Sequence, residues 1–195
     1  AAIAAHPIAG TLAAPLIKKG VSKVVPLDAW GGGTAGLAVV GQTTWHARQG
    51  VQAVKVQWQP PATGALDTQR IQADLLKALN EESGFTFHEQ GVPTQAEKSA
   101  TTRIDALYQA PYLAHVTMEP MNCTAQVKDG KVEIWVPTQV PQMARDMAAK
   151  VAKVDKDKVT VHVTQLGGGF GRRLDVDFVG QAVQVAMACD GQPVQ

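Results

Sequence analysis

Residues 159–173 read VTVHVTQLGGGFGRR, an alternating apolar segment that runs into four glycines, one phenylalanine and two arginines. Glycine lets the backbone take a positive φ and approach a ligand without a Cβ in the way, so the N–H groups of such a turn can face an anion or an oxo group. The two arginines add fixed positive charge. A tight strand-to-helix connection explains the same glycines by geometry alone, and for an isolated turn this is the commoner explanation.

Two nucleotide-binding motifs do not fit this turn. A G-x-G-x-x-G fingerprint counted from Gly167 or Gly169 meets Arg172 or Leu174 where its last glycine should stand. A Walker A loop needs a lysine and a hydroxyl residue after its last glycine, and two arginines follow Gly171 instead. Both motifs are therefore excluded.

Gln139 is a second residue whose position could serve chemistry. It ends the turn Pro-Thr-Gln, which follows an expected strand at 132–136 and precedes a helix expected from Pro141. Its side-chain amide can donate a hydrogen bond to an oxygen atom above the turn. Two parallel strand–turn–helix units would bring Gln139 beside Phe170, at the carboxyl ends of neighbouring strands, where ligands usually bind. The spacing alone favours two ordinary loops.

Other kinds of site have little support. The five histidines show no paired spacing, so we expect no metal bound by protein ligands, and no Gly-x-Ser-x-Gly elbow occurs. Cys123 and Cys189 lie far apart without a C-x-x-C partner, which indicates two small core side chains and leaves one disulfide open. Glu119 is a possible acid or base, but a carboxylate before a proline is more often a turn residue.

The composition indicates a globular chain without the strong net charge that is typical of nucleic-acid-binding proteins. It has 195 residues, 45% of them hydrophobic, and a net charge of +1. Nothing points to nucleic acid, and no apolar run reaches the ~20 residues of a membrane span. The chain begins AAIAAHP without a methionine and ends in a turn that leads towards a further strand. We therefore expect it to be a piece of a longer protein.

The apolar spacing predicts a mixed α+β chain in three parts. Residues 1–58 form a small α+β unit, residues 59–102 a linker with a helix at about 66–82, and residues 103–195 a second unit. Asp129-Gly130 predicts a hairpin turn, and Met143, Met147 and Val151 predict one buried helix face. The expected elements are strands at 24–27 and 37–40 around the loop 31–33, a helix at 43–49, strands at 54–58, 103–109, 114–118, 123–127 and 132–136, a helix from Pro141, a strand at 159–163, and a helix that buries Val176, Val179 and Val183.

Three segments together resemble a known family: HVTMEPMNCTA at 115–125, WVPTQ at 135–139 and GGGFGRR at 167–173. They are similar to the molybdopterin-binding subunit of the xanthine dehydrogenase and aldehyde oxidase family, most of all to large (β) subunits of the isoquinoline 1-oxidoreductase and periplasmic aldehyde dehydrogenase type. The resemblance is strong over 103–190. Residues 24–58 resemble the end of the family's N-terminal α/β hammerhead domain, and residues 62–91 show no resemblance.

The resemblance implies a fold and a set of roles. The fold would be an α/β hammerhead-like piece followed by part of the molybdopterin-binding domain, with a mixed sheet and packed helices. Gln139 would be the catalytic residue of this chain, hydrogen-bonded to an oxo ligand of molybdenum. The cofactor would be molybdopterin cytosine dinucleotide, with no direct protein ligand to the metal. Its binding residues would be Gly168, Gly169, Phe170, Gly171 and Arg172, the arginine facing the dithiolene and pyrophosphate region.

Leu174 bears on the substrate. Purine-oxidising members of the family carry a lysine and a glutamate where this chain has Arg173 and Leu174. An apolar wall leaves the polar edges of a purine unpaired. The resemblance therefore implies hydroxylation, with water-derived oxygen, of a less polar N-heteroaromatic ring such as isoquinoline, or of an aldehyde.

The resemblance also implies partners. The family's general base is a glutamate in a far C-terminal segment that this chain lacks, so the chain alone should be inactive. Electrons would leave through a small subunit with two [2Fe-2S] clusters, a cytochrome c is a further candidate partner, and the location would be periplasmic. Two alternatives stay open: a non-catalytic fragment or assembly module of the same fold, and, if the motif match is chance, a generic anion-binding α+β domain.

Overall fold

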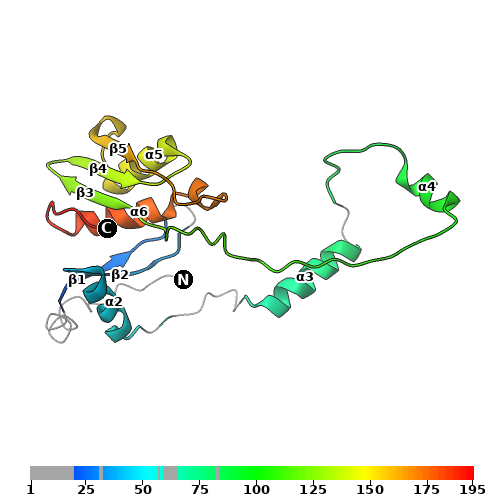
Figure 1. The fold of residues 1–195 in the computed structure, drawn as a ribbon, viewed down its shortest axis with the longest axis horizontal. Helices are drawn as coiled ribbons and strands as arrows, with labels where there is room; N and C mark the ends of the chain where they lie inside the picture. The colour runs from blue at the N-terminus through cyan, green and yellow to red at the C-terminus, as the bar shows by residue number, and fades with distance from the viewer. Residues whose placement is uncertain (1–19, 31–32, 57, 59–65, 82–83) are drawn as a thin grey trace. The chain divides into compact units, whose positions relative to one another are not determined.

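The computed structural model describes residues 20–30, 33–56, 58, 66–81 and 84–195 (Figure 1). The chain divides into two compact units: residues 62–113 form one, and the segments 1–61 and 114–195 together form the other. Helices and strands occur with both antiparallel and parallel pairing, so the predicted α+β class is confirmed. No described helix is long and apolar enough to cross a membrane.

A three-stranded mixed sheet carries the larger unit. Strand β3 (Thr124–Lys128) pairs antiparallel with β4 (Lys131–Val136), which pairs parallel with β5 (Val159–Val163). The predicted hairpin between β3 and β4 is confirmed: Asp129 has φ 50° and Gly130 φ 70°. A turn with two left-handed residues matches the twist of its flanking strands, and Asp-Gly is well suited to it.

Helix α5 (Pro141–Ala152) and a short 3-10 turn, η1 (Lys156–Lys158), connect the two parallel strands. Proline stands at the start of the helix, where its missing N–H costs no hydrogen bond, and Lys153 ends it with φ 55°. The predicted buried face is wrong for Met143, which is 52% exposed, whereas Val151 is buried. The other buried residues of α5 all have small side chains: Ala144, Ala148 and Ala149.

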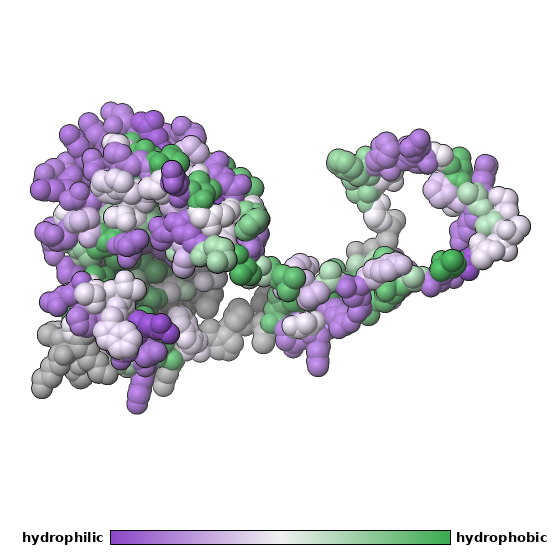
Figure 2. All heavy atoms as spheres, in the orientation of Figure 1, coloured by the Kyte–Doolittle hydropathy of each residue, from purple (hydrophilic) through white to green (hydrophobic). Residues whose placement is uncertain are grey.

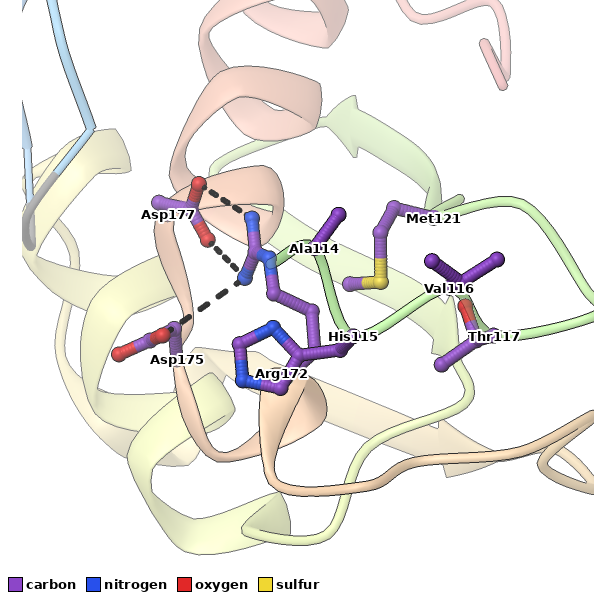
Figure 3. Close-up of a pocket in the computed structure, with 8 residues that line it drawn as sticks. All are labelled: Ala114, His115, Val116, Thr117, Met121, Arg172, Asp175 and Asp177. Carbon is purple, nitrogen blue, oxygen red and sulfur yellow. Dashed lines mark hydrogen bonds and ion pairs between the residues drawn. The ribbon is translucent and has the colours of Figure 1, made fainter. Parts of the chain in front are cut away.

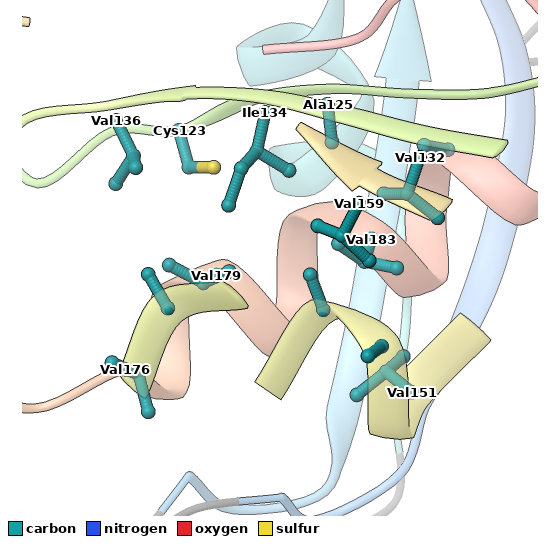
Figure 4. Packing of buried hydrophobic residues seen from close by; sticks show 14 of the residues in the cluster. Cys123, Ala125, Val132, Ile134, Val136, Val151, Val159, Val176, Val179 and Val183 are labelled. Carbon is teal, nitrogen blue, oxygen red and sulfur yellow. The ribbon is translucent and has the colours of Figure 1, made fainter. Parts of the chain in front are cut away.

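Helix α6 (Asp177–Met187) follows the glycine turn through the 3-10 turn η2 (Arg172–Leu174) and packs on α5 and β3. The predicted burial of Val176, Val179 and Val183 is confirmed, and Figure 4 shows these side chains among those of the sheet. The two cysteines are both buried and free, so the disulfide left open by the sequence does not form. The common core contains Cys123, Ala125, Val132, Ile134, Val136, Val159, Val176, Val179 and Val183.

The opposite face of the sheet is polar. Trp135 on β4 stacks on His162 of β5, with ring centroids 4.9 Å apart and an angle of 11° between the planes. His162 is exposed, as the alternation of β5 predicts. Near the chain end, Val194 exchanges two backbone hydrogen bonds with Ala125 (2.8 and 2.9 Å), so this segment does approach the edge strand β3.

The N-terminal piece of this unit has its own two-stranded sheet. Strand β1 (Val21–Leu27) pairs antiparallel with β2 (Gly36–Gly41), and α2 (Thr44–Ala53) packs on both. Asp28 and Gln184 exchange hydrogen bonds that tie this piece to α6. The strand predicted at 54–58 is wrong for residues 54–56 and 58, where Trp58 is 57% exposed. Residues 31, 32 and 57 lie outside the described residues.

The second unit contains α3 (Thr68–Glu81) and α4 (Pro93–Ser99). Helix α3 lies where the spacing predicts a helix, and α4 was not expected. The strands predicted at 103–109, and at 114–118 in the larger unit, are wrong: these residues are irregular, because among the described residues no strand pairs with them. Many apolar side chains of the second unit are exposed, as the hydropathy view shows (Figure 2).

Candidate functional site

The turn that carries Gln139 and the glycine turn lie against each other. Because β4 and β5 are parallel neighbours, their carboxyl ends meet at one edge of the sheet. The backbone N–H of Gln139 donates to the carbonyl of Arg173 at 3.1 Å, and the Thr138 hydroxyl donates to the same oxygen at 3.2 Å. A Cβ added to Gly169 would lie 2.7 Å from Oε1 of Gln139. The two turns therefore lie side by side, as two parallel strand–turn–helix units would place them, and they are not the two independent loops that the spacing alone favoured.

The glycine turn takes backbone conformations that explain its composition. Gly168 has φ 98° and Gly171 φ 85°, values that other residues rarely adopt. Phe170 has φ 49°, a left-handed conformation that costs a residue with a side chain about 1–2 kcal/mol. Within the described residues, the N–H groups of 168–171 donate to no other group. The turn therefore offers four successive backbone donors to an acceptor from outside.

Arg173, for which the sequence predicted no role, is the buried centre of the site. Its side chain is fully buried. Nε donates to the carbonyl of Gly168 at 2.8 Å, and Nη1 to the carbonyl of Pro137 at 3.2 Å. Nη2 donates to Glu119 twice, to its carbonyl at 3.0 Å and to Oε2 at 2.8 Å. One guanidinium thus joins the glycine turn, the turn that leads to Gln139 and the segment around residue 119.

Glu119 has a structural role, as its place before a proline indicated. Its Oε2 also accepts from the N–H of Gly167 at 2.8 Å, and Oε1 accepts from the Asn122 side chain at 2.9 Å. The Gly167 N–H, then Asn122, lower the pKa of Glu119 below its ordinary value, and the charge of Arg173 adds to them against the opposing effect of burial. Both oxygens of an ionised carboxylate are thus occupied, so Glu119 is not placed to act as a base.

Arg172 lines a cavity of about 590 Å³ (Figure 3). Its guanidinium makes a two-pronged ion pair with Asp177, at 2.9 Å on both sides, and lies 3.8 Å from Asp175. The hydrogen bond that Arg172 donates to Asp177 raises the pKa of Arg172. The charge is therefore partnered inside the chain. The cavity lining is Ala114, His115, Val116, Thr117, Met121, Arg172, Asp175 and Asp177.

The remaining predicted site residues are at the surface. Gln139 is exposed, Phe170 is 72% exposed and Leu174 is 48% exposed. Leu174 belongs to η2 and does not contribute to the described lining of the Arg172 cavity. Among the described residues, no group of three or more His, Cys, Asp or Glu side chains gathers where a metal ion could be held. The structure thus brings Gln139 against Gly169, with Gly168 and Phe170 beside Gly169 in the chain and Leu174 further along.

A family model, described as the molybdopterin cofactor-binding domain, matches residues 78–195. The chain belongs to this family. The matched range contains the whole three-stranded sheet, both turns and α6, so the predicted family is confirmed. A generic anion-binding domain with a chance motif match is excluded.

Relatives with assigned functions are oxidoreductases. The chain is 33% identical over 161 residues to a membrane-bound aldehyde dehydrogenase [pyrroloquinoline-quinone] of Gluconacetobacter polyoxogenes, a match that covers 82% of this chain and 21% of that protein. It is 30% identical over 168 residues to the isoquinoline 1-oxidoreductase subunit beta of Brevundimonas diminuta, covering 78% of this chain and 21% of the relative. A xanthine dehydrogenase of Emericella nidulans is 27% identical over 154 residues, covering 77% and 10%. The chain spans about a fifth of the length of the first two relatives.

Proposed function

We propose that the glycine turn and Gln139 form part of the cofactor site of a molybdenum hydroxylase. The close approach of Gly169 to Gln139 carries the proposal, because it places a side-chain amide directly beside a row of free backbone N–H groups. All these groups are hydrogen-bond donors, and an oxo- and sulfur-rich anionic cofactor presents acceptors. The residues present therefore fit molybdopterin, and we infer its cytosine dinucleotide form.

Bound there, the cofactor would supply the redox chemistry that hydroxylates a substrate with oxygen derived from water. Gln139 would donate its side-chain amide to an oxygen of the cofactor and fix its orientation. Gly168 and Gly169 would let the backbone approach without a Cβ, and the N–H groups of Phe170 and Gly171 would donate to the same ligand. The charge of Arg172 is already balanced by Asp177, so this residue would contribute a hydrogen-bond donor at the edge of the site rather than net positive charge.

The substrate is proposed from Leu174. Its exposed apolar side chain favours an N-heteroaromatic ring of the isoquinoline type, or an aldehyde, over a polar purine. The intact enzyme, assayed with isoquinoline, an aromatic aldehyde and hypoxanthine, tests this directly. We expect kcat/KM to be lowest for hypoxanthine, and a higher value for hypoxanthine than for both other substrates would refute it.

The complete enzyme is proposed to need more than this chain. The general base would come from a further part of the large subunit, electrons would pass to a small subunit with two [2Fe-2S] clusters and on to an acceptor such as a cytochrome c, and the enzyme would work in the periplasm. These proposals rest on the family and on relatives about five times the matched length.

A second candidate role is a non-catalytic fragment or assembly module that binds no cofactor by itself. This role is supported by the share of its relatives that the chain spans, about a fifth of their length. Molybdenum and cytosine nucleotide analysis of the purified 195-residue chain and of the full-length subunit separates the two. Cofactor in the long form alone supports an incomplete part of a hydroxylase, whereas cofactor in neither form contradicts the proposed site.

The cofactor proposal itself is tested with Gln139→Ala in the full-length enzyme. We expect molybdenum content to be retained in large part while kcat falls by about 10²-fold, because the amide contributes to orientation rather than to the whole affinity. Wild-type kcat per bound molybdenum in this variant would refute the assigned role of Gln139.

A further inference from the structure

The glycine turn has few contacts of its own that could hold it at a fixed distance from Gln139. Within the described part of the chain, residues 168–171 take part in backbone hydrogen bonds only as acceptors. The carbonyl of Gly169 accepts from the Arg172 N–H at 2.9 Å, and that of Gly171 accepts from the Leu174 N–H at 3.1 Å. Those bonds shape the turn locally. They do not connect it to the strand β4, from which Gln139 follows.

Arg173 makes that connection. Its guanidinium binds carbonyls on both sides of the site, at Gly168 in the glycine turn and at Pro137 in the turn before Gln139. Its own carbonyl accepts from the Gln139 N–H and the Thr138 hydroxyl. The residue therefore fixes the spacing of the two turns through its backbone and its side chain together.

Glu119 anchors the guanidinium from the third side. It bonds to Gly167 in both directions, since its Oε2 accepts from the Gly167 N–H and its own N–H donates to the Gly167 carbonyl at 3.0 Å. The same Oε2 accepts from Arg173 at 2.8 Å. Among the described residues, no buried side-chain nitrogen or oxygen is left without a partner, so the buried charge is fully compensated.

We propose that Arg173 and Glu119 are a positioning pair for the cofactor site, which holds the donors of the glycine turn at the working distance from the Gln139 amide. The inference rests on the proposed function and assigns roles to two residues that touch neither cofactor nor substrate. A planar guanidinium is required because it binds the three segments with a fixed fork of donors. A lysine offers one compact ammonium that cannot reach all four acceptors in the same geometry.

The full-length enzyme with its partner subunits tests the pair through Arg173→Lys. We expect kcat per bound molybdenum to fall about 100-fold with KM unchanged, since a displacement of ~1 Å in a reacting geometry costs about this much. Arg145→Lys on α5 is the matched control, because Arg145 also donates to a backbone carbonyl, that of Lys156 at 2.8 Å, and this bond involves neither of the two turns. It should leave kcat per bound molybdenum unchanged.

Amide hydrogen exchange of the cofactor-free protein supplies a readout that does not depend on activity. In Arg173→Lys, exchange should quicken at Glu119, Gln139 and Gly167, whose N–H groups are hydrogen-bonded between the three segments, and stay unchanged in β4 and α6. Uniformly faster exchange through the sheet and α6 would show a general loss of stability and overturn the positioning role. Wild-type kcat per bound molybdenum in Arg173→Lys would overturn it as well.

Glu119→Gln keeps the inference testable if Arg173→Lys does not accumulate as folded protein. It retains the shape and the backbone carbonyl of residue 119 and removes only the carboxylate, so we expect the same local exchange pattern and a fall in kcat of about tenfold. Wild-type exchange and wild-type kcat in Glu119→Gln would refute the pair. If the wild-type enzyme holds no molybdenum, the proposed function fails, and the exchange result still decides whether the pair positions the two turns.

Discussion

Gly169→Ala should separate the folding of this protein from its chemistry. The added Cβ would lie 2.7 Å from Oε1 and 3.0 Å from Cδ of Gln139, and contact at 3.4 Å or more is ordinary for such an atom. The backbone of Gly169 does not have a positive φ, so alanine brings no backbone strain there. The three nearest atoms among the described residues all belong to the Gln139 side chain, whose amide must move back by several tenths of an ångström.

The cost to stability should be small, because the obstructing atoms are the far end of an exposed, flexible side chain. We expect the free energy of unfolding to change by less than about 1 kcal/mol, with the smaller entropy of the unfolded alanine chain offsetting part of the strain. The cost to activity should be large, because the Gln139 amide is displaced from the position proposed for cofactor contact. A fall in kcat per bound molybdenum of about 10- to 100-fold follows.

The assay compares three quantities for wild type and Gly169→Ala of the full-length enzyme: thermal or urea unfolding, molybdenum content, and kcat with the best substrate. Gly169→Ser is a companion, since its hydroxyl adds a further atom against the same amide and should lower kcat at least as much. Unchanged kcat per bound molybdenum would refute the placement of Gln139 at the cofactor. A loss of more than ~2 kcal/mol in stability would refute the view that the amide is free to move.

Four further outcomes follow from other contacts. Gly167→Ala should destabilise the fold by about 1–3 kcal/mol in urea unfolding, because its Cβ would clash with the Cβ of Glu119, which cannot swing away; wild-type stability would contradict this. Ile134→Ala, in the fully buried face of β4, should cost about 2–5 kcal/mol in the same assay, and a loss below ~1 kcal/mol would contradict the packing. The folded-state pKa of Glu119 lies below its ordinary 4.5, so the ionised carboxylate stabilises the fold above that pH and loses this effect as the pH falls. Glu119→Gln should therefore flatten the acid limb of a plot of unfolding free energy against pH. An unchanged acid limb would refute this role of the carboxylate. Burial raises the pKa of Cys123 to about 12 and also raises that of Cys189. Neither thiol should therefore react with iodoacetamide at pH 8 until the protein is denatured. Labelling of the native protein, detected by mass spectrometry, would contradict this.

Local sequence patterns predicted the elements that need only near neighbours. Asp129-Gly130 predicted the hairpin, because its two left-handed residues suit one turn type. Alternation predicted β4 and β5, and the valines at 176, 179 and 183 predicted the buried face of α6. The candidate site could also be predicted from the sequence. Gln139 and the glycine turn each follow a parallel strand, so they lie side by side whenever those two strands are neighbours in the sheet.

Long-range packing overturned other expectations. The alternating segments at 103–109 and 114–118 have strand-like composition, but no described strand pairs with them, and a strand without a partner leaves its backbone groups to water. Met143 has the right spacing for a helix core. It is exposed, and three alanines occupy buried positions on α5 instead, so the spacing of the large apolar residues alone did not identify the buried face.

The sequence by itself determined the family, the strand–turn–helix order and the glycines that the turn conformation demands, since these depend on residue types and on neighbours in the chain. Only the tertiary structure decided that Arg173 is buried against Glu119, and that Arg172 is paired with Asp177 rather than left free. Two adjacent arginines are equivalent in sequence. They differ here because Arg173 meets carbonyls of its own turn and of two distant segments in the interior, whereas Arg172 lies at a cavity edge beside the start of α6.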